Sequence, residues 1–327
     1  MSTATLDIPT LERLIVAAVA APSLHNTQPW RFGFDAQTRT VQVHAATDHG
    51  LRHTDPAGRA VHLSVGCAVF NLRVAAARYG WEPVTRLLPR PDRPDLLATV
   101  RLGGAARTAR ASALYEALWC RHSSRFPYSD RPLPADLLAE LTEAAHVEGA
   151  SLSFPGPRGT GRILRATWDA EVRNRGDADR AAESRHWTSG PHPALSGLAP
   201  AALGPQDCLD RIPVRDFGAH RHPAVLLTRP YETHPALALL RTAHDRRTDW
   251  LRAGQALERV LLVATARGVR TSLFHQALEW PDLRRILDGP TGSGGPGRAQ
   301  MVIRLGYGPE GPASPRRTVE EVMGNSV

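Results

Sequence analysis

The sequence contains no lysine. All 40 basic side chains are arginines, set against 32 acidic ones, and the formal net charge is +8. Without lysine, a phosphate-binding loop of the G-K-[ST] type is excluded, and any anion site must use arginines, hydroxyls and backbone N–H groups. The arginines are dispersed and accompany no recognisable nucleic-acid motif. We attribute the charge to compositional bias and expect no nucleic-acid partner.

Cysteines and long apolar runs are also scarce. The three cysteines (Cys67, Cys120 and Cys208) are odd in number and far apart, which argues against a disulfide framework and a C-x-x-C site. No Cys, Asp or Glu set completes a metal site around the histidines, so we predict no metal. The longest apolar run is too short to span a bilayer, and MSTATLDIPT at the start carries no secretion signal. We expect a cytoplasmic protein that does not bind membranes.

The sequence predicts the first elements of secondary structure. Apolar positions 11, 14, 15 and 18 predict a helix with Thr10 as its N-cap, ending before Pro22. The loop APSLHNTQPWRF (21–32) follows and leads into strands near 30–34 and 41–43. A second helix is predicted to begin near Asp55 and to close at Gly80.

The loop concentrates hydrogen-bonding side chains at Ser23, His25, Asn26, Thr27 and Gln28. Amide and hydroxyl groups of this kind can bind the edge of a planar heterocycle. They also often bond to their own backbone in turns. The residues alone leave both interpretations open.

Segments of the first half of the chain are similar in sequence to segments of the second half. Residues 68–80 match residues 256–268 at a spacing of 188, and the first helix matches residues 138–145 at a spacing of 127. The ordered matches indicate an internal duplication, with halves at 1–110 and 111–327. The growth in spacing implies an insertion in the second half, at about 150–210. Because part of it is long and rich in Pro and Gly, we interpret the insertion as a lid rather than a disordered segment.

Two basic segments are candidate anion sites. Arg121-His-Ser-Ser-Arg125 places two guanidiniums and two hydroxyls close together at the start of the second half, although composition alone favours a solvated turn. Ser314-Pro-Arg-Arg317 is an ordinary basic tail unless the fold brings it beside Arg121 and Arg125.

Taken together, these segments resemble the nitroreductase superfamily of FMN-dependent oxidoreductases. The loop is similar to the family form A-P-S-x-x-N-x-Q-P-W-x-F, and residues 121–125 are similar to its R-x-S-x-R signature. With ALERVLLVATARG, RLGYGP and SPRR, they resemble the Acg-type branch, whose members carry two nitroreductase-like halves in one chain. The resemblance implies an α+β fold, a pseudo-dimer of two antiparallel sheet-and-helix halves. Such a chain can act as a monomer or assemble as a homodimer.

The resemblance also implies a site. Ordinary members build two FMN sites across a subunit interface, whereas this chain has the parts for one FMN. The second half would supply the phosphate side from Arg121, Ser123, Arg125, Arg316 and Arg317. The first half would supply the ring side from Ser23, His25, Asn26, Thr27 and Gln28. A further family segment implies ring contacts from Leu273, Phe274, His275 and Gln276, with the Gln276 N–H as the partner of flavin N5. Here the chain departs from the branch, because His275-Gln-Ala277 replaces the usual Asn-Gln-Pro.

The activity implied is hydride transfer from NAD(P)H to FMN N5, then reduction of a nitro compound, quinone or similar small-molecule acceptor. Solvent can supply protons, so we predict no catalytic residue. The lid leaves a second hypothesis open, in which the protein binds or sequesters FMN with little NAD(P)H turnover. A third, an arginine-rich nucleic-acid binder, predicts a colourless protein.

Overall fold

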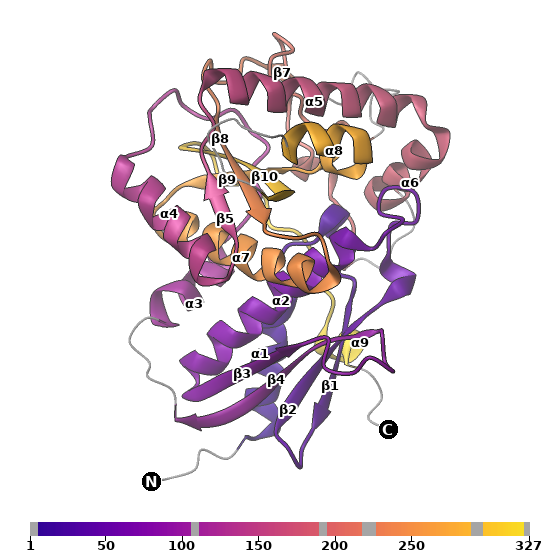
Figure 1. Ribbon diagram of the computed structural model, residues 1–327, viewed down its shortest axis with the longest axis vertical. Helices are drawn as coiled ribbons and strands as arrows, with labels where there is room; N and C mark the ends of the chain where they lie inside the picture. The colour runs from indigo at the N-terminus through magenta and orange to yellow at the C-terminus, as the bar shows by residue number, and fades with distance from the viewer. Residues whose placement is uncertain (1–5, 106–110, 190–194, 218–226, 289–296, 324–327) are drawn as a thin grey trace.

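The computed structural model describes residues 6–105, 111–189, 195–217, 227–288 and 297–323. Within them, two four-stranded antiparallel sheets lie apart, with helices between them and further helices beyond the second sheet (Figure 1). The fold is therefore α+β, as the sequence predicts.

The first sheet is built by residues 30–105, and its strands pair in the order β1-β2-β4-β3. In chain order, the elements of this half are α1 (Ile8–Val19), η1 (Leu24–Asn26), β1 (Trp30–Asp35), β2 (Thr40–Ala45), η2 (Thr47–His49), α2 (Arg59–Arg78), β3 (Trp81–Leu87) and β4 (Leu96–Ala105).

The second sheet has the strand order β5-β8-β10-β9. Its half contains α3 (Ala111–Cys120), α4 (Ala135–Val147), β5 (Ser151–Ser153), β8 (Ala236–Thr242), α7 (Arg247–Ala266), β9 (Arg270–Phe274), η5 (Gln276–Glu279), α8 (Pro281–Asp288) and β10 (Arg298–Gly306). Between β5 and β8 lie α5 (Pro157–Gly176), α6 (Ala178–Ser189), η3 (Pro200–Ala202), β6 (Gln206–Asp207) and β7 (Thr228–Arg229).

The two halves share one topology. Each has a helix, two strands, a long helix and two more strands, and the corresponding strands take the same places in the two sheets. The long helices α2 and α7 are both 20 residues long and begin and end 188 positions apart. Each is closed by a left-handed glycine, Gly80 or Gly268, as the sequence predicts. An internal duplication would produce this arrangement.

One cluster of buried apolar side chains runs through both halves. The helices α2 and α7 pack against each other at its centre. Among the described helices, α2 is the one long and apolar enough to cross a membrane, but 83% of its apolar window is buried inside the protein. Its apolar length is accounted for by its place in the core.

Two helix starts differ from the prediction. The N-cap of α1 is Asp7 rather than Thr10, and the Asp7 carboxylate accepts a hydrogen bond from the Thr10 N–H (2.9 Å). The proline after Ile8 is tolerated inside this first turn because its missing N–H would have no helical partner. The helix α2 begins at Arg59, after a left-handed Gly58, rather than near Asp55.

The insertion is longer and more regular than predicted. It occupies residues 154–235 rather than about 150–210, because 151–153 form a strand of the second sheet. Its first part is helical: Ile163, Ala166, Thr167 and Ala170 form a buried stripe on α5, a period that the Pro- and Gly-rich stretch obscures in the sequence. The helix α5 packs against η5 and α8 (Figure 1). Residues 190–194 of the Pro- and Gly-rich stretch lie outside the described residues.

The C-terminal segment returns to the first half. The short helix α9 (Val319–Val322) packs against α1 and β1, and Met323 pairs with Phe32 of β1. Residues 314–317 therefore pass close to the loop after α1.

Candidate functional site

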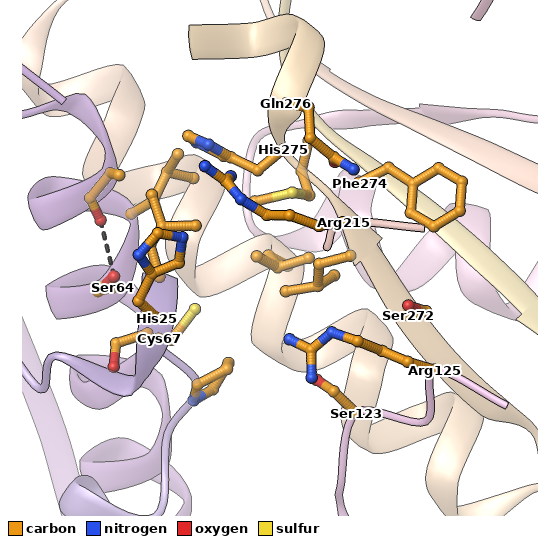
Figure 2. A pocket seen from close by; sticks show the side chains of 18 of the residues that line it. His25, Ser64, Cys67, Ser123, Arg125, Arg215, Ser272, Phe274, His275 and Gln276 are labelled. Atoms are coloured by element: carbon orange, nitrogen blue, oxygen red, sulfur yellow. Dashed lines mark hydrogen bonds between the residues drawn. The ribbon is translucent and has the colours of Figure 1, made fainter. Parts of the chain in front are cut away.

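A cavity of about 790 Å³, part of it open to solvent, lies where the two halves and the insertion meet. Figure 2 shows its lining converging from the loop after α1, from α2, from residues 123–125, from β9 and η5, and from the insertion. Leu63, Leu257 and Met301 are among the apolar side chains of its walls.

The fold brings several predicted segments together at this cavity. The predicted residues that line it are Ser23, His25, Ser123, Arg125, Leu273, Phe274, His275 and Gln276. The predicted residues outside its lining are Asn26, Thr27, Gln28, Arg121, Arg316 and Arg317.

The loop after α1 has an uncommon backbone. His25, Asn26 and Gln28 have positive φ angles of 53°, 54° and 51°, a conformation that costs a non-glycine residue about 1 kcal/mol or more. The Asn26 amide donates to the carbonyls of Gly197 in the insertion (2.9 Å) and Pro315 in the C-terminal segment (3.0 Å). Gln28 bonds to the same two segments. These amides fasten the insertion and the C-terminal segment to the loop, and neither lines the cavity.

The other polar side chains of the loop divide between turn and cavity. The Ser23 hydroxyl accepts from the Gln28 N–H (2.9 Å), as in a self-satisfied turn. His25 lies at the cavity wall in Figure 2, and neither of its ring nitrogens has a hydrogen-bond partner among the described residues. Burial and the charge of Arg215 lower the His25 pKa well below its ordinary value. The neutral imidazole therefore offers one donor and one acceptor to an occupant of the cavity.

Residues 121–125 run beside β9. The Ser124 N–H donates to the Thr271 carbonyl (2.8 Å), which aligns Ser123 with that strand. Arg125 lines the cavity and donates to the Ala202 carbonyl (2.7 Å), and it forms no ion pair with a carboxylate of the described residues. Burial and the charge of Arg215 lower its pKa to about 10. A half-buried cation without a counter-ion favours an anionic ligand.

Arg121 and Arg316 meet beside this wall. Both donate to the Ala20 carbonyl, at 3.1 and 3.3 Å, so the fold does bring the C-terminal basic segment beside Arg121. The buried Glu258 of α7 lies 3.5 Å from Arg121 Nε. Burial raises the Glu258 pKa to about 7 against the opposing effect of Arg121, and burial with the Arg121 charge lowers the Arg316 pKa to about 9.

Arg317 has a different role from Arg316. Its backbone N–H donates to Gln28 Oε1 (2.8 Å), and its guanidinium donates to backbone carbonyls, among them that of Glu321. Thr27 likewise serves structure, because its carbonyl bonds to a ring nitrogen of His49 (2.9 Å).

Residues 272–276 carry β9 into η5. The Gln276 side chain donates to the Pro213 carbonyl of the insertion (3.1 Å). His275 is held on both sides, with Arg59 Nη2 at 2.7 Å from its Nε2 and Glu279 Oε1 at 3.1 Å from its Nδ1. Burial lowers the His275 pKa to about 4, so the ring is neutral.

Other lining residues were not predicted. Ser64 and Cys67 lie on the buried face of α2, and their non-aliphatic character at a helical spacing is the one signal that the sequence offered. Arg215 and Phe217 come from the insertion. No motif marks them, because their place depends on how the insertion folds over the cavity.

At the position that corresponds to this site in the other half, side chains of the protein pair with one another. At the spacing of 188, Cys67 corresponds to Gln255 of α7. There, Arg73 donates to Glu148 (2.6 Å) and Gln255 (2.7 Å), and Arg259 donates to the other Glu148 oxygen (2.9 Å). A carboxylate of the chain thus lies between the two guanidiniums, in the manner of a bound anion.

The walls of the cavity are chemically mixed. Aliphatic and aromatic surfaces suit a planar, partly apolar ligand, and Arg125 with Ser123 suits an anionic group on it. Among the described residues, no group of three or more His, Cys, Asp or Glu side chains gathers as a metal site would require.

Comparison with known proteins identifies relatives over nearly the whole chain. The model of the nitroreductase family matches residues 120–307. The protein named "Putative NAD(P)H nitroreductase Rv3131" of Mycobacterium tuberculosis is 30% identical over 99% of this chain and 93% of its own length. The "Putative NAD(P)H nitroreductase acg" of the same organism is 28% identical over 98% of this chain and 96% of its own.

Solved structures also align with this chain. One from Bacteroides fragilis with bound FMN matches 63% of this chain and 94% of its own, at 17% identity and a TM-score of 0.37. The protein named "putative nitroreductase" from Anabaena variabilis matches 93% of this chain and 89% of its own, at 12% identity and a TM-score of 0.47.

Proposed function

Because the chain belongs to the nitroreductase family, we propose that its central cavity binds FMN and that the protein is an NAD(P)H-dependent reductase of nitro compounds, quinones or similar acceptors. Membership of the family makes it an oxidoreductase. The cofactor, the electron donor and the acceptor are the parts that we propose.

The observation that carries the proposal is a cavity lined, in the described part of the chain, by a guanidinium without a counter-ion and by an imidazole without a hydrogen bond. Arg125 has no counter-ion among the described residues, and both ring nitrogens of His25 are buried without a hydrogen bond in the same part of the chain. Buried polar groups are normally satisfied, so such groups around one cavity favour a ligand that carries an anionic group and a hydrogen-bonding ring. FMN has both, and the residues present fit it.

The residues that would hold FMN follow from their chemistry. Arg125 and Ser123 are placed for an anionic or polar part of the cofactor, and Arg121 with Arg316 adds positive charge beside them. Leu63, Leu257 and Met301 offer apolar surface to a ring. The Gln276 N–H is our proposed donor to flavin N5.

When bound, FMN supplies the hydride chemistry, and the protein supplies orientation, electrostatics and exclusion of water. Neutral His25 would bond to the ring edge without adding charge. The buried tautomer of His275 is fixed by its two partners, so it holds the segment beside the ring in place and takes no proton near neutral pH.

We propose one FMN per chain. The position that corresponds to the cavity in the other half is occupied by the Arg73–Glu148–Arg259 ion pairs. Because one chain supplies both halves of the interface, we propose that a monomer is sufficient for binding.

The first test is the absorption spectrum of the protein. The purified protein, or the apoprotein titrated with FMN, should show the flavin absorption bands at one equivalent per chain. Anaerobic addition of NADPH or NADH should then bleach the visible band, and a nitroaromatic compound or a quinone should restore it. A protein that ignores added FMN would remove the basis of the proposal.

A second candidate function is a flavin-holding protein with little turnover. The specific observation is that the insertion bonds to both sides of the cavity, through Asn26 to Gly197 and through Arg125 to Ala202. Phe217 lies against the ring of His25, with centroids 5.2 Å apart. An insertion fastened in this way would keep FMN in and nicotinamide out. Flavin that dithionite reduces but NAD(P)H does not would favour this function over the reductase.

Gln28→Ala separates the two functions further. This change removes a bond to the insertion, from Gln28 Nε2 to the Leu195 carbonyl (2.7 Å), at a residue outside the cavity lining. If the insertion obstructs nicotinamide, the variant should be reduced by NADPH faster than the wild type and should release FMN faster. Unchanged reduction by NADPH would show that the fastening does not limit access.

A further inference from the structure

Arg215 is the charged side chain that the insertion contributes to the cavity lining. It is 8% exposed, and both of its terminal nitrogens donate to the carboxylate of Glu279. In Figure 2 its side chain lies between the α2 wall, with His25 and Ser64, and the opposite wall, with Ser272 and Arg125. The insertion thus contributes a fixed cation to the site as well as covering it.

Glu279 is shared among several donors. Arg180 of the insertion donates to Glu279 Oε2 (3.2 Å), and Asn174 donates to the same oxygen (3.4 Å). Arg180 and Arg215 therefore divide one buried carboxylate between them. Arg180 is outside the cavity lining, whereas Arg215 is part of it.

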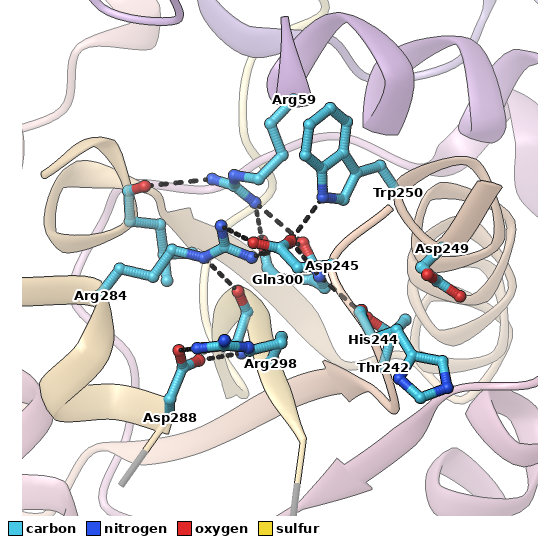
Figure 3. Close-up of polar contacts among 12 residues, drawn as sticks. Arg59, Thr242, His244, Asp245, Asp249, Trp250, Arg284, Asp288, Arg298 and Gln300 are labelled. Atoms are coloured by element: carbon cyan, nitrogen blue, oxygen red, sulfur yellow. Dashed lines mark hydrogen bonds and ion pairs between the residues drawn. The ribbon is translucent and has the colours of Figure 1, made fainter. Parts of the chain in front are cut away.

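The neighbouring groups leave the local charge positive. A guanidinium can only donate, so the bond from Arg59 makes His275 Nε2 the acceptor and leaves Nδ1–H to donate to Glu279. His275 is therefore neutral, while Arg59 adds a further cation, held by the Gln300 carbonyl at 2.7 Å (Figure 3). Within the insertion, the carboxyl groups of Glu171 and Asp216 also interact electrostatically with Arg215. Asp216 forms an ion pair with Arg175 (3.0 Å).

A flavin ring changes charge when it is reduced. A hydride from NAD(P)H brings two electrons and one proton, so the ring gains one negative charge unless a second proton follows, and NAD(P)H leaves as NAD(P)⁺. A cation fixed beside the ring in a water-poor cavity stabilises that charge without reorganising. Arg215 is held at the cavity wall, where its guanidinium lies over the Phe217 ring at 5.5 Å from the centroid, and the Arg125 guanidinium lies over the same ring at 5.1 Å.

We propose that Arg215 is the group through which the insertion acts on the bound flavin: it stabilises the reduced ring and so raises its reduction potential, and Glu279 is a positioning residue that aims and partly neutralises Arg215. This inference rests on the proposed binding of FMN. It makes the insertion a working part of the redox site. If the insertion served only as a cover, Arg215 would stabilise the fold of the insertion and would not affect the flavin.

The test is an anaerobic redox titration of FMN-loaded protein against a reference dye. Arg215→Met should lower the equilibrium ratio of reduced to oxidised flavin about tenfold at a given potential, which is a fall of about 30 mV for a two-electron couple. Arg180→Met is the matched control, because it removes an arginine from the same carboxylate but not from the cavity wall. It should change that ratio less than threefold. Arg215→Lys keeps the charge and should restore most of the wild-type ratio.

Glu279→Gln gives a result of opposite sign. Removing the carboxylate leaves Arg215 less neutralised, so the ratio of reduced to oxidised flavin should rise, whereas a purely structural Glu279 would leave it unchanged or lower it. This variant with Arg215→Lys decides the matter if Arg215→Met does not fold. Equal shifts in Arg215→Met and Arg180→Met, or no shift in either, would overturn the inference. A wild-type protein that does not bind FMN would instead refute the proposed function.

Discussion

Gly66 of α2 and Gly254 of α7 lie directly against each other. A Cβ built on Gly66 would be 2.9 Å from the Gly254 Cα and 2.3 Å from the Leu251 carbonyl oxygen. In return, a Cβ on Gly254 would be 2.8 Å from the Gly66 Cα and 2.1 Å from the Leu63 carbonyl oxygen. At the spacing of 188, Gly66 corresponds to Gly254 and Leu63 to Leu251, so the two sets of contacts are equivalent. The pair of glycines therefore marks the point where the pseudo-symmetry axis passes between the two central helices.

Alanine at either glycine should force the helices apart. Real Cβ atoms do not approach backbone oxygens so closely, and neither backbone can yield without moving its helix, so we expect Gly66→Ala or Gly254→Ala to lower the free energy of unfolding by about 3 kcal/mol. Urea denaturation measures the change. Gly161→Ala in α5 is the control, because its Cβ would meet nothing within 4 Å, and it should raise stability by about 0.5–1 kcal/mol. Equal effects at the central and control positions would contradict the close contact.

Arg125→Met should reduce FMN affinity while leaving the apoprotein folded. The lost charge-assisted contact is worth about 2 kcal/mol, or roughly a 30-fold increase in Kd. Because Arg125 has no ion pair with a described carboxylate, its removal leaves no buried charge unpaired. Fluorescence quenching of FMN measures the Kd. Arg131→Met is the control, since Arg131 is exposed and stacks on Tyr307 away from the cavity, and its Kd should equal that of the wild type.

Glu258 should make the stability of the apoprotein depend on pH. Its pKa is raised from 4.5 to about 7 in the fold, so between these values the native state holds a proton that the unfolded state has lost. The contribution of Glu258 to the free energy of unfolding is therefore complete below pH 4.5. It decreases by about 3 kcal/mol in all as the pH rises to 7. Glu258→Gln cannot lose a proton and should escape this fall.

The measurement is the difference in unfolding free energy between Glu258→Gln and the wild type, taken from pH 5 to pH 8. From pH 5 to pH 8, the unfolding free energy of the variant relative to that of the wild type should increase by about 2–3 kcal/mol. A constant difference across this range would show that the carboxyl group ionises normally despite its burial.

Glu148→Ala should open the filled counterpart of the site. The carboxylate joins two partly buried guanidiniums, so its loss should cost about 2 kcal/mol, between the values for surface and fully buried pairs. With FMN occupying the main cavity, added inorganic phosphate should raise the melting temperature of the variant more than that of the wild type. Glu140→Ala is the control, because Glu140 is an exposed carboxylate of α4 that pairs with Arg267, just after the end of α7. It should show neither effect.

Much of the fold was readable because it depends on local patterns. The stripes of α1 and α2, the glycines that close α2 and α7, and the match at a spacing of 188 all record which faces are buried or which turns need a left-handed residue. The insertion was read less well. Its helix α5 buries apolar residues and packs against η5 and α8, elements that come about a hundred residues later.

The site shows the same division. Eight of the lining residues were predicted because their segments have an unusual composition and resemble family motifs: Ser23, His25, Ser123, Arg125, Leu273, Phe274, His275 and Gln276. The amides of Asn26 and Gln28 were expected at the ring, but they bond to segments about 170 and 290 residues away, which no local pattern reveals. Arg215 escaped notice for the converse reason: in a chain with 40 arginines, one more carries no information until its surroundings are known.

The loop after α1 has a consequence for the order of events during synthesis. Its left-handed residues Asn26 and Gln28 are held by Pro315, Arg316 and Arg317, about 289 positions further along the chain. Until those residues have emerged from the ribosome, the loop lacks these partners. We therefore expect a ligand of the cavity to be acquired only after the C-terminal segment has been translated.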